Sequence, residues 1–193
     1  MSEIVSLDQL IRTMKKSPNS MERAQAARGI GHLKDPGAIQ ALLEALGDSD
    51  YEVRQAVIWA LEQIRDEHLV DDLIDDLNHE DPDVRRGVAY VLGEIGDREA
   101  VDPLCNALND DNLYVRKSAI EALASIGDWK AVDHIISRLD DEDLYVRQAA
   151  ATALGEMGEM RAEEALQRLL RTEQELIVRH AIRVALARLA GGD

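Results

Sequence analysis

A single motif, Val-Arg, recurs along the chain at a nearly constant interval. Its arginine stands every 31 residues through five copies and 32 residues further on in the sixth, and Val precedes it in five of the six. A fixed period of this length indicates an array of structural repeats, in which each repeat packs on its neighbours. The repeated arginines are Arg23, Arg54, Arg85, Arg116, Arg147 and Arg179.

Each repeat has the pattern of a helical hairpin. A polar or acidic residue stands four positions before each arginine, and such side chains accept hydrogen bonds from the free N–H groups that open a helix. Apolar residues then recur at helical spacing, as in Val84, Val88 and Leu92, and in three repeats a glycine ends the pattern. We expect helices over residues 7–16, 20–33, 36–46, 51–65, 67–77, 82–95, 98–108, 113–126, 129–139, 144–157, 161–170 and 176–189.

One hairpin of this size cannot bury its apolar faces alone, whereas stacked hairpins share a continuous core. The sequence therefore predicts one all-α domain over residues 1–193, folded as a right-handed α-solenoid (an α-α superhelix) of six hairpins. The expected units are residues 6–34, 36–65, 67–96, 98–127, 129–158 and 160–190.

The repeated motif, Asp-x-x-Val-Arg followed by Leu-Gly-x-Ile-Gly-Asp at residues 81–97, resembles the HEAT repeat, and in particular the HEAT-like subtype named after phycobilisome lyases. The resemblance covers nearly the whole chain. It implies an armadillo-like solenoid in which the Val-Arg helices are the inner helices and line a concave, partner-binding surface. We expect the repeated arginines and the acids of the turns to form a structural hydrogen-bond ladder.

A candidate binding surface lies on the inner helices, because the positions two before the arginine and one, five and nine after it form one stripe that packing does not require. Trp59 and Tyr90 hold equivalent positions on it, and exposed Trp, Tyr and Arg commonly anchor protein interfaces. For Tyr114 and Tyr145, packing at the helix start is an equal alternative. The predicted partner-binding residues are Arg28, Tyr51, Gln55, Trp59, Arg86, Tyr90, Tyr114, Lys117 and Tyr145.

The net charge of −16 argues against nucleic acid and anionic membranes as partners, since both attract Lys and Arg. We find no signal peptide and no stretch of transmembrane length, so we predict a cytoplasmic protein. The excess of acids, and of Arg over Lys, favours a prokaryotic source. Cys105 is expected to be a buried apolar residue, and the acidic patch at residues 71–76 a solvated outer face.

The sequence lacks the iron-binding residues that one related enzyme family with helical repeats requires. Deoxyhypusine hydroxylase, another HEAT-type family, binds two irons through His-Glu dipeptides on inner helices, but the only such dipeptide here, His79-Glu80, falls in a turn. We therefore predict no catalytic residue, no metal and no cofactor, and a non-enzymatic scaffold that binds another protein. One alternative is a bilin lyase-like subunit that holds phycocyanobilin between Trp59, Tyr90, Arg28 and Arg86. A third is a purely structural subunit of a larger complex.

Overall fold

The computed structural model describes residues 5–64 and 68–191, and this part of the chain consists of α-helices and short 3-10 turns without a strand. The chain divides into two compact units, Met1–Val91 and Leu92–Asp193. Each unit is built from consecutive helical hairpins, as predicted. The exit turn expected at Arg65 lies outside the described residues.

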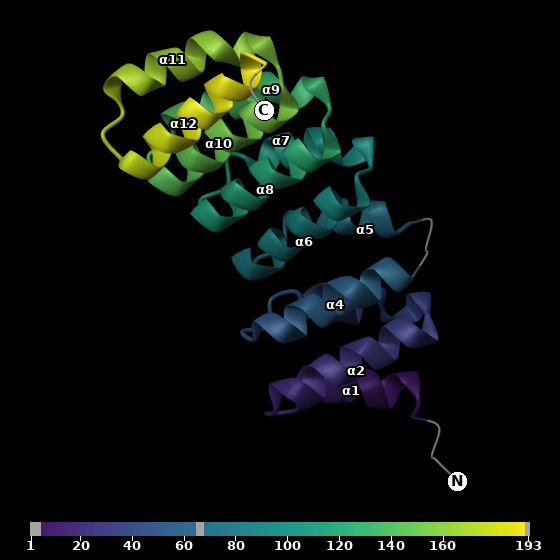
Figure 1. The fold of residues 1–193 in the computed structure, drawn as a ribbon. Helices are drawn as coiled ribbons and strands as arrows, with labels where there is room; N and C mark the ends of the chain where they lie inside the picture. The colour runs from purple at the N-terminus through teal and green to yellow at the C-terminus, as the bar shows by residue number, and fades with distance from the viewer. Residues whose placement is uncertain (1–4, 65–67, 192–193) are drawn as a thin grey trace. The chain divides into compact units, whose positions relative to one another are not determined.

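In the first unit the inner helices α2 and α4 pack side by side (Figure 1). A Cβ atom on Gly31 of α2 would lie 2.8 Å from the Cα of Ala60 in α4, so glycine allows the two backbones to approach closely. The elements are α1 (Leu7–Lys16), α2 (Ser20–Leu33), η1 (Pro36–Ala38), α3 (Ile39–Ala45), α4 (Tyr51–Gln63), α5 (Leu69–Asp76) and α6 (Pro82–Ile95), the last of which continues into the second unit.

The second unit repeats this packing among α8, α10 and α12 (Figure 1). A Cβ on Gly155 of α10 would lie 2.6 Å from the Cα of Ala185 in α12. The elements are η2 (Arg98–Ala100), α7 (Val101–Ala107), α8 (Leu113–Ile126), η3 (Trp129–Ala131), α9 (Val132–Ser137), η4 (Arg138–Asp140), α10 (Leu144–Met157), η5 (Met160–Ala162), α11 (Glu163–Thr172) and α12 (Leu176–Leu189).

The inner helices begin and end where the sequence pattern places them, except that α4 ends at Gln63. Their first turns are closed by the predicted caps: the side chain of Asn112, for example, accepts hydrogen bonds from the N–H groups of Tyr114 and Val115. Glu175, the one glutamate among the six cap positions, makes no such bond. Glycine closes α8 in the left-handed conformation, with a φ of 68° at Gly127.

Several outer helices differ from the prediction because they open with a 3-10 turn instead of a continuous α-helix. In three of them an aspartate caps this turn by accepting a hydrogen bond from the N–H two residues later; these aspartates are Asp35, Asp97 and Asp128. At Gly96-Asp97 and Gly127-Asp128 the Gly-Asp pair that ends an inner helix therefore also starts the next outer one, whereas Lys34 takes the place of the glycine before Asp35. The sequence interpretation credited only the glycine of this pair with a role.

Candidate interaction surface on the inner helices

The repeated arginines are fixed in one geometry throughout the chain. In all six repeats, Nη1 of the arginine donates to the carbonyl oxygen six residues earlier, at distances between 2.7 and 3.0 Å. This bond holds the guanidinium across the turn that precedes the inner helix.

Arg23, Arg116 and Arg147 also each bind a carboxylate from the turn of the following repeat. Between Arg116 and Asp141, Nε and Nη2 lie 3.0 and 2.9 Å from the two carboxylate oxygens, and the side chains are only 8% and 5% exposed. The hydrogen bond to Asp141 is the largest influence that raises the pKa of Arg116. The three pairs are Arg23–Asp48, Arg116–Asp141 and Arg147–Glu173. The predicted ladder is confirmed in these pairs.

The acids of the ladder are held in their charged form. The hydrogen bond from Arg147 lowers the pKa of Glu173 most, and the backbone N–H groups of Glu175 and Gln174 lower it further. Burial opposes the ionisation of Asp48, but bonds from Arg23 and a backbone N–H lower its pKa below the ordinary value.

At Arg54 the residue in the partner position of the ladder is not an acid. The equivalent turn residue in the following repeat is His79, whose Nδ1 accepts the N–H of Asp81 at 3.0 Å and so replaces the capping bond of an aspartate without supplying a carboxylate. The guanidinium of Arg54 instead lies over the ring of Tyr51, 5.8 Å from its centroid. Tyr51, a predicted partner-binding residue, is therefore exposed but already held by a neighbour.

The first unit contains the predicted centre of the binding surface. The Trp59 ring is half-buried in the seam between α4 and α2, edge-on to His32 with centroids 5.1 Å apart, and it fills the space beside Gly31. Tyr90 on α6 is exposed, and Gln55 on α4 is half-buried. Trp59 thus contributes to packing as well as to the surface.

The predicted basic residues each have an acidic neighbour on the inner helices. The distance between a side-chain nitrogen and a carboxylate oxygen is 3.9 Å in Arg28–Glu52, 3.2 Å in Arg86–Asp83 and 2.7 Å in Lys117–Glu121. These are exposed or half-exposed pairs, which stabilise a fold by less than about 1 kcal/mol. They can therefore exchange partners at little cost when another molecule binds.

In the second unit, the side chains of Tyr114 and Tyr145 are 60% and 51% exposed at the first turns of α8 and α10. Their backbone N–H groups donate to the cap residues Asn112 and Asp143, so the helix starts that carry the two rings are firmly positioned. Both tyrosines present their rings to solvent.

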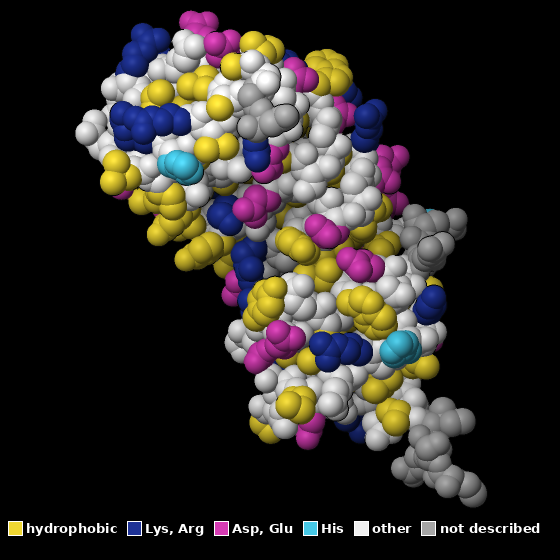
Figure 2. All heavy atoms as spheres, in the orientation of Figure 1, with side chains coloured by type: hydrophobic (Ala, Val, Ile, Leu, Met, Phe, Trp, Pro, Cys, Tyr) yellow, Lys and Arg dark blue, Asp and Glu magenta, His cyan; other side chains and the backbone are white. Residues whose placement is uncertain are grey.

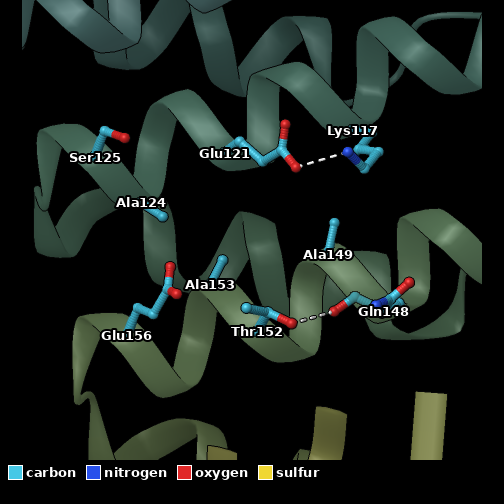
Figure 3. Close-up of a pocket in the computed structure, with 9 residues that line it drawn as sticks. All are labelled: Lys117, Glu121, Ala124, Ser125, Gln148, Ala149, Thr152, Ala153 and Glu156. Atoms are coloured by element: carbon cyan, nitrogen blue, oxygen red, sulfur yellow. Dashed lines mark hydrogen bonds and ion pairs between the residues drawn. The ribbon is translucent and has the colours of Figure 1, made fainter. Parts of the chain in front are cut away.

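A groove of about 450 Å³ runs between α8 and α10 in the second unit (Figure 3). Small side chains form its floor, and the pair Lys117–Glu121 and the side chain of Glu156 stand along its sides. The lining residues are Lys117, Glu121, Ala124, Ser125, Gln148, Ala149, Thr152, Ala153 and Glu156.

Sequence reasoning placed the polar members of this lining on the stripe but gave most weight to the aromatic residues. Sequence reasoning gave no weight to the small residues Ala124, Ala149 and Ala153. Because these residues face each other across two helices, they leave a hollow between α8 and α10. Of the predicted site residues, the groove contains only Lys117.

The other titratable groups of the described residues can be assessed for metal-ligand geometry by their positions in the fold. No group of three or more His, Cys, Asp or Glu side chains among the described residues is arranged to hold a metal ion. Cys105 is buried, and burial raises the pKa of its thiol to about 11. No described helix is both long enough and apolar enough to cross a membrane.

The acidic patch on α5 is solvated at three of its four positions, as expected. Asp76 differs: it is half-buried, and its Oδ2 atom is enclosed without a hydrogen-bond partner among the described residues. Burial raises the pKa of this carboxyl. The corresponding residues of two other outer helices are the small apolar Ala45 and Ala107, and that of a third is Arg138.

Comparison with known proteins establishes the family to which the chain belongs. A family profile described as HEAT repeats matches residues 7–75, 70–143 and 103–187, so the chain belongs to the HEAT repeat family. A search of curated proteins finds no significant match.

Solved structures support the same fold. The chain is similar to a designed armadillo repeat protein in complex with the peptide (KR)4 (18% identity, 95% of this chain and 99% of the other, TM-score 0.58). It is also similar to the complex of CpcE and CpcF of phycocyanin lyase from Nostoc sp. (25% identity, 94% and 77%, 0.56). Human deoxyhypusine hydroxylase matches at 21% identity (96% and 74%, 0.56). The predicted all-α repeat solenoid is confirmed.

Proposed function

We propose that this HEAT-repeat protein is a non-enzymatic module that binds another protein through the inner-helix face, which consists, within each of the two units, of the stripe residues of the inner helices and the tyrosines at their first turns. The observation that carries this proposal is the exposure of four tyrosine side chains, Tyr51, Tyr90, Tyr114 and Tyr145, on inner helices whose starts are fixed by caps and arginines. Aromatic rings on rigid elements bury a large area at low entropic cost.

The surroundings of these rings support a protein partner. The basic residues Arg28, Arg86 and Lys117 are matched by acids, so the face offers both signs of charge at short range. Such alternation suits the mixed surface of a folded protein or peptide. One of the similar structures contains a bound peptide, and another is a complex of two protein subunits.

The likeness to phycocyanin lyase subunits supports a second proposal, in which the protein handles a bilin. In that case Arg28 and Arg86 would pair with the propionates of the tetrapyrrole, and both would have to leave Glu52 and Asp83. The protein-binding proposal needs no such rearrangement.

The test is affinity capture from an extract of the source organism, followed by binding measurements with the purified partner. We would compare the wild type with the variants Trp59→Ala/Tyr90→Ala and Tyr114→Ser/Tyr145→Ser. The matched control is Trp129→Ala, because Trp129 is an equally exposed aromatic residue that lies on the 3-10 turn preceding α9, away from the stripe.

We expect one protein to be retained by the wild type and by Trp129→Ala, and its affinity to fall at least about tenfold in one of the double variants. Because Trp59 also packs against α2, circular dichroism would first establish that the variants are folded. Recovery of a coloured small molecule by the wild type would favour bilin handling instead. Equal recovery of the protein by every variant would refute the inner-helix face as the binding site.

A further inference from the structure

α12 is a basic helix in an acidic protein. Between Leu176 and Leu189 it has three arginines and one histidine but no Asp or Glu, whereas every other inner helix carries at least one acidic residue. Figure 2 shows Lys and Arg side chains together with a histidine and hydrophobic side chains over the region of α11 and α12. The local charge is thus opposite to that of the whole chain, whose net charge is −16.

The same helix exposes large apolar side chains. Leu176 is 81% exposed, and Ile177 and Val184 are exposed as well. The leucines equivalent to Leu176, at the starts of α8 and α10, are half-buried. We call the exposed surface of this helix the α12 face; it consists of Leu176, Ile177, His180, Arg183, Val184 and Arg188.

The guanidinium of Arg179 indicates which chemical group of a partner binds at this helix. Its Nη1 donates to the carbonyl oxygens of Glu173 and Leu170 at 2.8 and 3.0 Å, so its guanidinium is oriented like those of the other repeats. In Arg147 the remaining donors, Nε and Nη2, hold the carboxylate of Glu173. Among the described residues, no carboxylate meets these two donors in Arg179. A half-buried guanidinium whose Nε and Nη2 meet no carboxylate among the described residues has the geometry to bind a bidentate carboxylate of another molecule.

The surface also has a suitable shape. A groove of about 180 Å³ between α10 and α12 borders the α12 face, with Ile177 and Val184 as apolar lining and His180 and Arg188 as basic lining. Leu176, Arg179 and Arg183 lie outside this groove. An amphipathic helix that lies along such a groove buries one apolar stripe and directs its polar side chains to the rim.

We propose that the α12 face docks an acidic amphipathic helix of a partner protein. One carboxylate of that helix binds Nε and Nη2 of Arg179, and its apolar side chains pack on Leu176, Ile177 and Val184. Ile177, His180, Val184 and Arg188 are the stripe residues of α12, so this docking site is the last-repeat part of the proposed inner-helix face, and it contains none of the aromatic residues of that face.

A second copy of this chain fits the α12 face less well. A Cβ atom on Gly29 of α2 would lie 3.0 Å from the side chain of Leu10 in α1; Gly29 corresponds to Ala60, the residue of α4 that faces α2. This side of α2 is therefore covered by α1, and a second copy could not stack its first repeat on α12 without displacing α1. Two α12 faces placed together would bring Arg183 and Arg188 against arginines of the same sign, which is unfavourable.

The test uses the full chain and a fluorescein-labelled peptide of about sixteen residues, with Leu on one helical face and Glu elsewhere, in a fluorescence anisotropy titration. A scrambled peptide of the same composition controls for simple charge attraction. The variants are Leu176→Ser, Arg179→Gln and Arg183→Glu. The matched controls are Met21→Ser, which removes an exposed apolar residue at the start of α2, and Arg171→Glu, which reverses an exposed charge on α11.

We expect the amphipathic peptide to bind at least about tenfold more tightly than the scrambled one, and Leu176→Ser and Arg179→Gln each to weaken it about tenfold. Leu176 is so exposed that its replacement leaves the fold intact, and the Trp59→Ala/Tyr90→Ala variant should bind normally. Equal binding of both peptides, or equal losses in Arg171→Glu and Arg183→Glu, would overturn the proposal. So would sedimentation that shows a dimer sensitive to Leu176→Ser but unaffected by the peptide.

Discussion

Replacing Glu173 by glutamine tests the arginine ladder where its geometry is most demanding. The Glu173 side chain is 5% exposed. Its Oε2 accepts a hydrogen bond from Nε of Arg147 at 2.7 Å, while Oε1 accepts the N–H groups of Gln174 and Glu175, each at 2.9 Å. A glutamine that keeps its oxygen on the two backbone donors must place its NH₂ group against Nε of Arg147. Two donors would then face each other in a buried site.

The expected cost follows from these contacts. A hydrogen bond between charged groups contributes about 1.5–3 kcal/mol, and removing one partner of a buried pair costs about 3–5 kcal/mol. Because the glutamine retains its backbone bonds, we expect Glu173→Gln to lower the free energy of unfolding by about 2–3 kcal/mol. Glu175→Gln, a change at an exposed neighbour without a side-chain cap bond, should change it by less than about 0.5 kcal/mol.

The assay is urea unfolding at pH 7, followed by far-ultraviolet circular dichroism. We expect a lower midpoint for Glu173→Gln with an unchanged slope. The same comparison at lower pH adds a second check. Because the pKa of Glu173 is lowered in the folded state, its stabilisation is present above the ordinary value of 4.5 and is lost as the pH falls through the lower, folded-state value. The two proteins should therefore converge in acid. A Glu173→Gln protein as stable as the wild type at pH 7 would refute a stabilising ladder.

Three further predictions concern packing and titration. Gly155→Ala should destabilise the protein by about 1–3 kcal/mol, despite the better helix propensity of alanine, because its Cβ would meet the backbone of Ala185; thermal unfolding measures this. Asp76→Ala should stabilise it by about 1 kcal/mol at pH 7 by removing a buried, unpartnered oxygen, and in urea titrations at several pH values this gain should shrink as the pH falls through the raised pKa of Asp76. Cys105, with a pKa of about 11, should react with iodoacetamide at pH 8 about a hundredfold more slowly in the native protein than in urea, and equal rates would contradict its burial.

The regular parts of the fold could be predicted from the sequence because each depends on local chemistry that repeats. Caps such as Asn112 and left-handed glycines such as Gly127 fix helix ends through contacts within a few residues. The ladder was also predictable, because Arg116 and Asp141 recur with the period of the repeat. Repetition makes such long-range contacts visible in the sequence.

The site was predictable only in outline. The stripe identified which positions face outward, but exposure at each position depends on the neighbouring helix. Trp59 proved half-buried because Gly31 leaves room for its ring, and Tyr51 is held by Arg54 because His79 replaces an acid in the next turn. The α8–α10 groove results from small residues on two helices together, and no single-helix pattern reveals it.

The binding role proposed for Arg179 could be inferred only from the structure. The sequence shows that this arginine is the sixth member of a series, but only the structure shows that its Nη1 is already engaged while Nε and Nη2 meet no carboxylate among the described residues. The same residue type therefore stabilises internal repeats and offers a binding group at α12.

The central claim, that the inner-helix face binds a protein, is tested most directly by hydrogen exchange on the chain with and without its captured partner. We expect added protection in α4, α8 and α10, the helices that carry Trp59, Tyr114 and Tyr145, and unchanged exchange in the outer helices α7 and α9. Protection confined to α7 and α9, with none on the inner helices, would contradict the account.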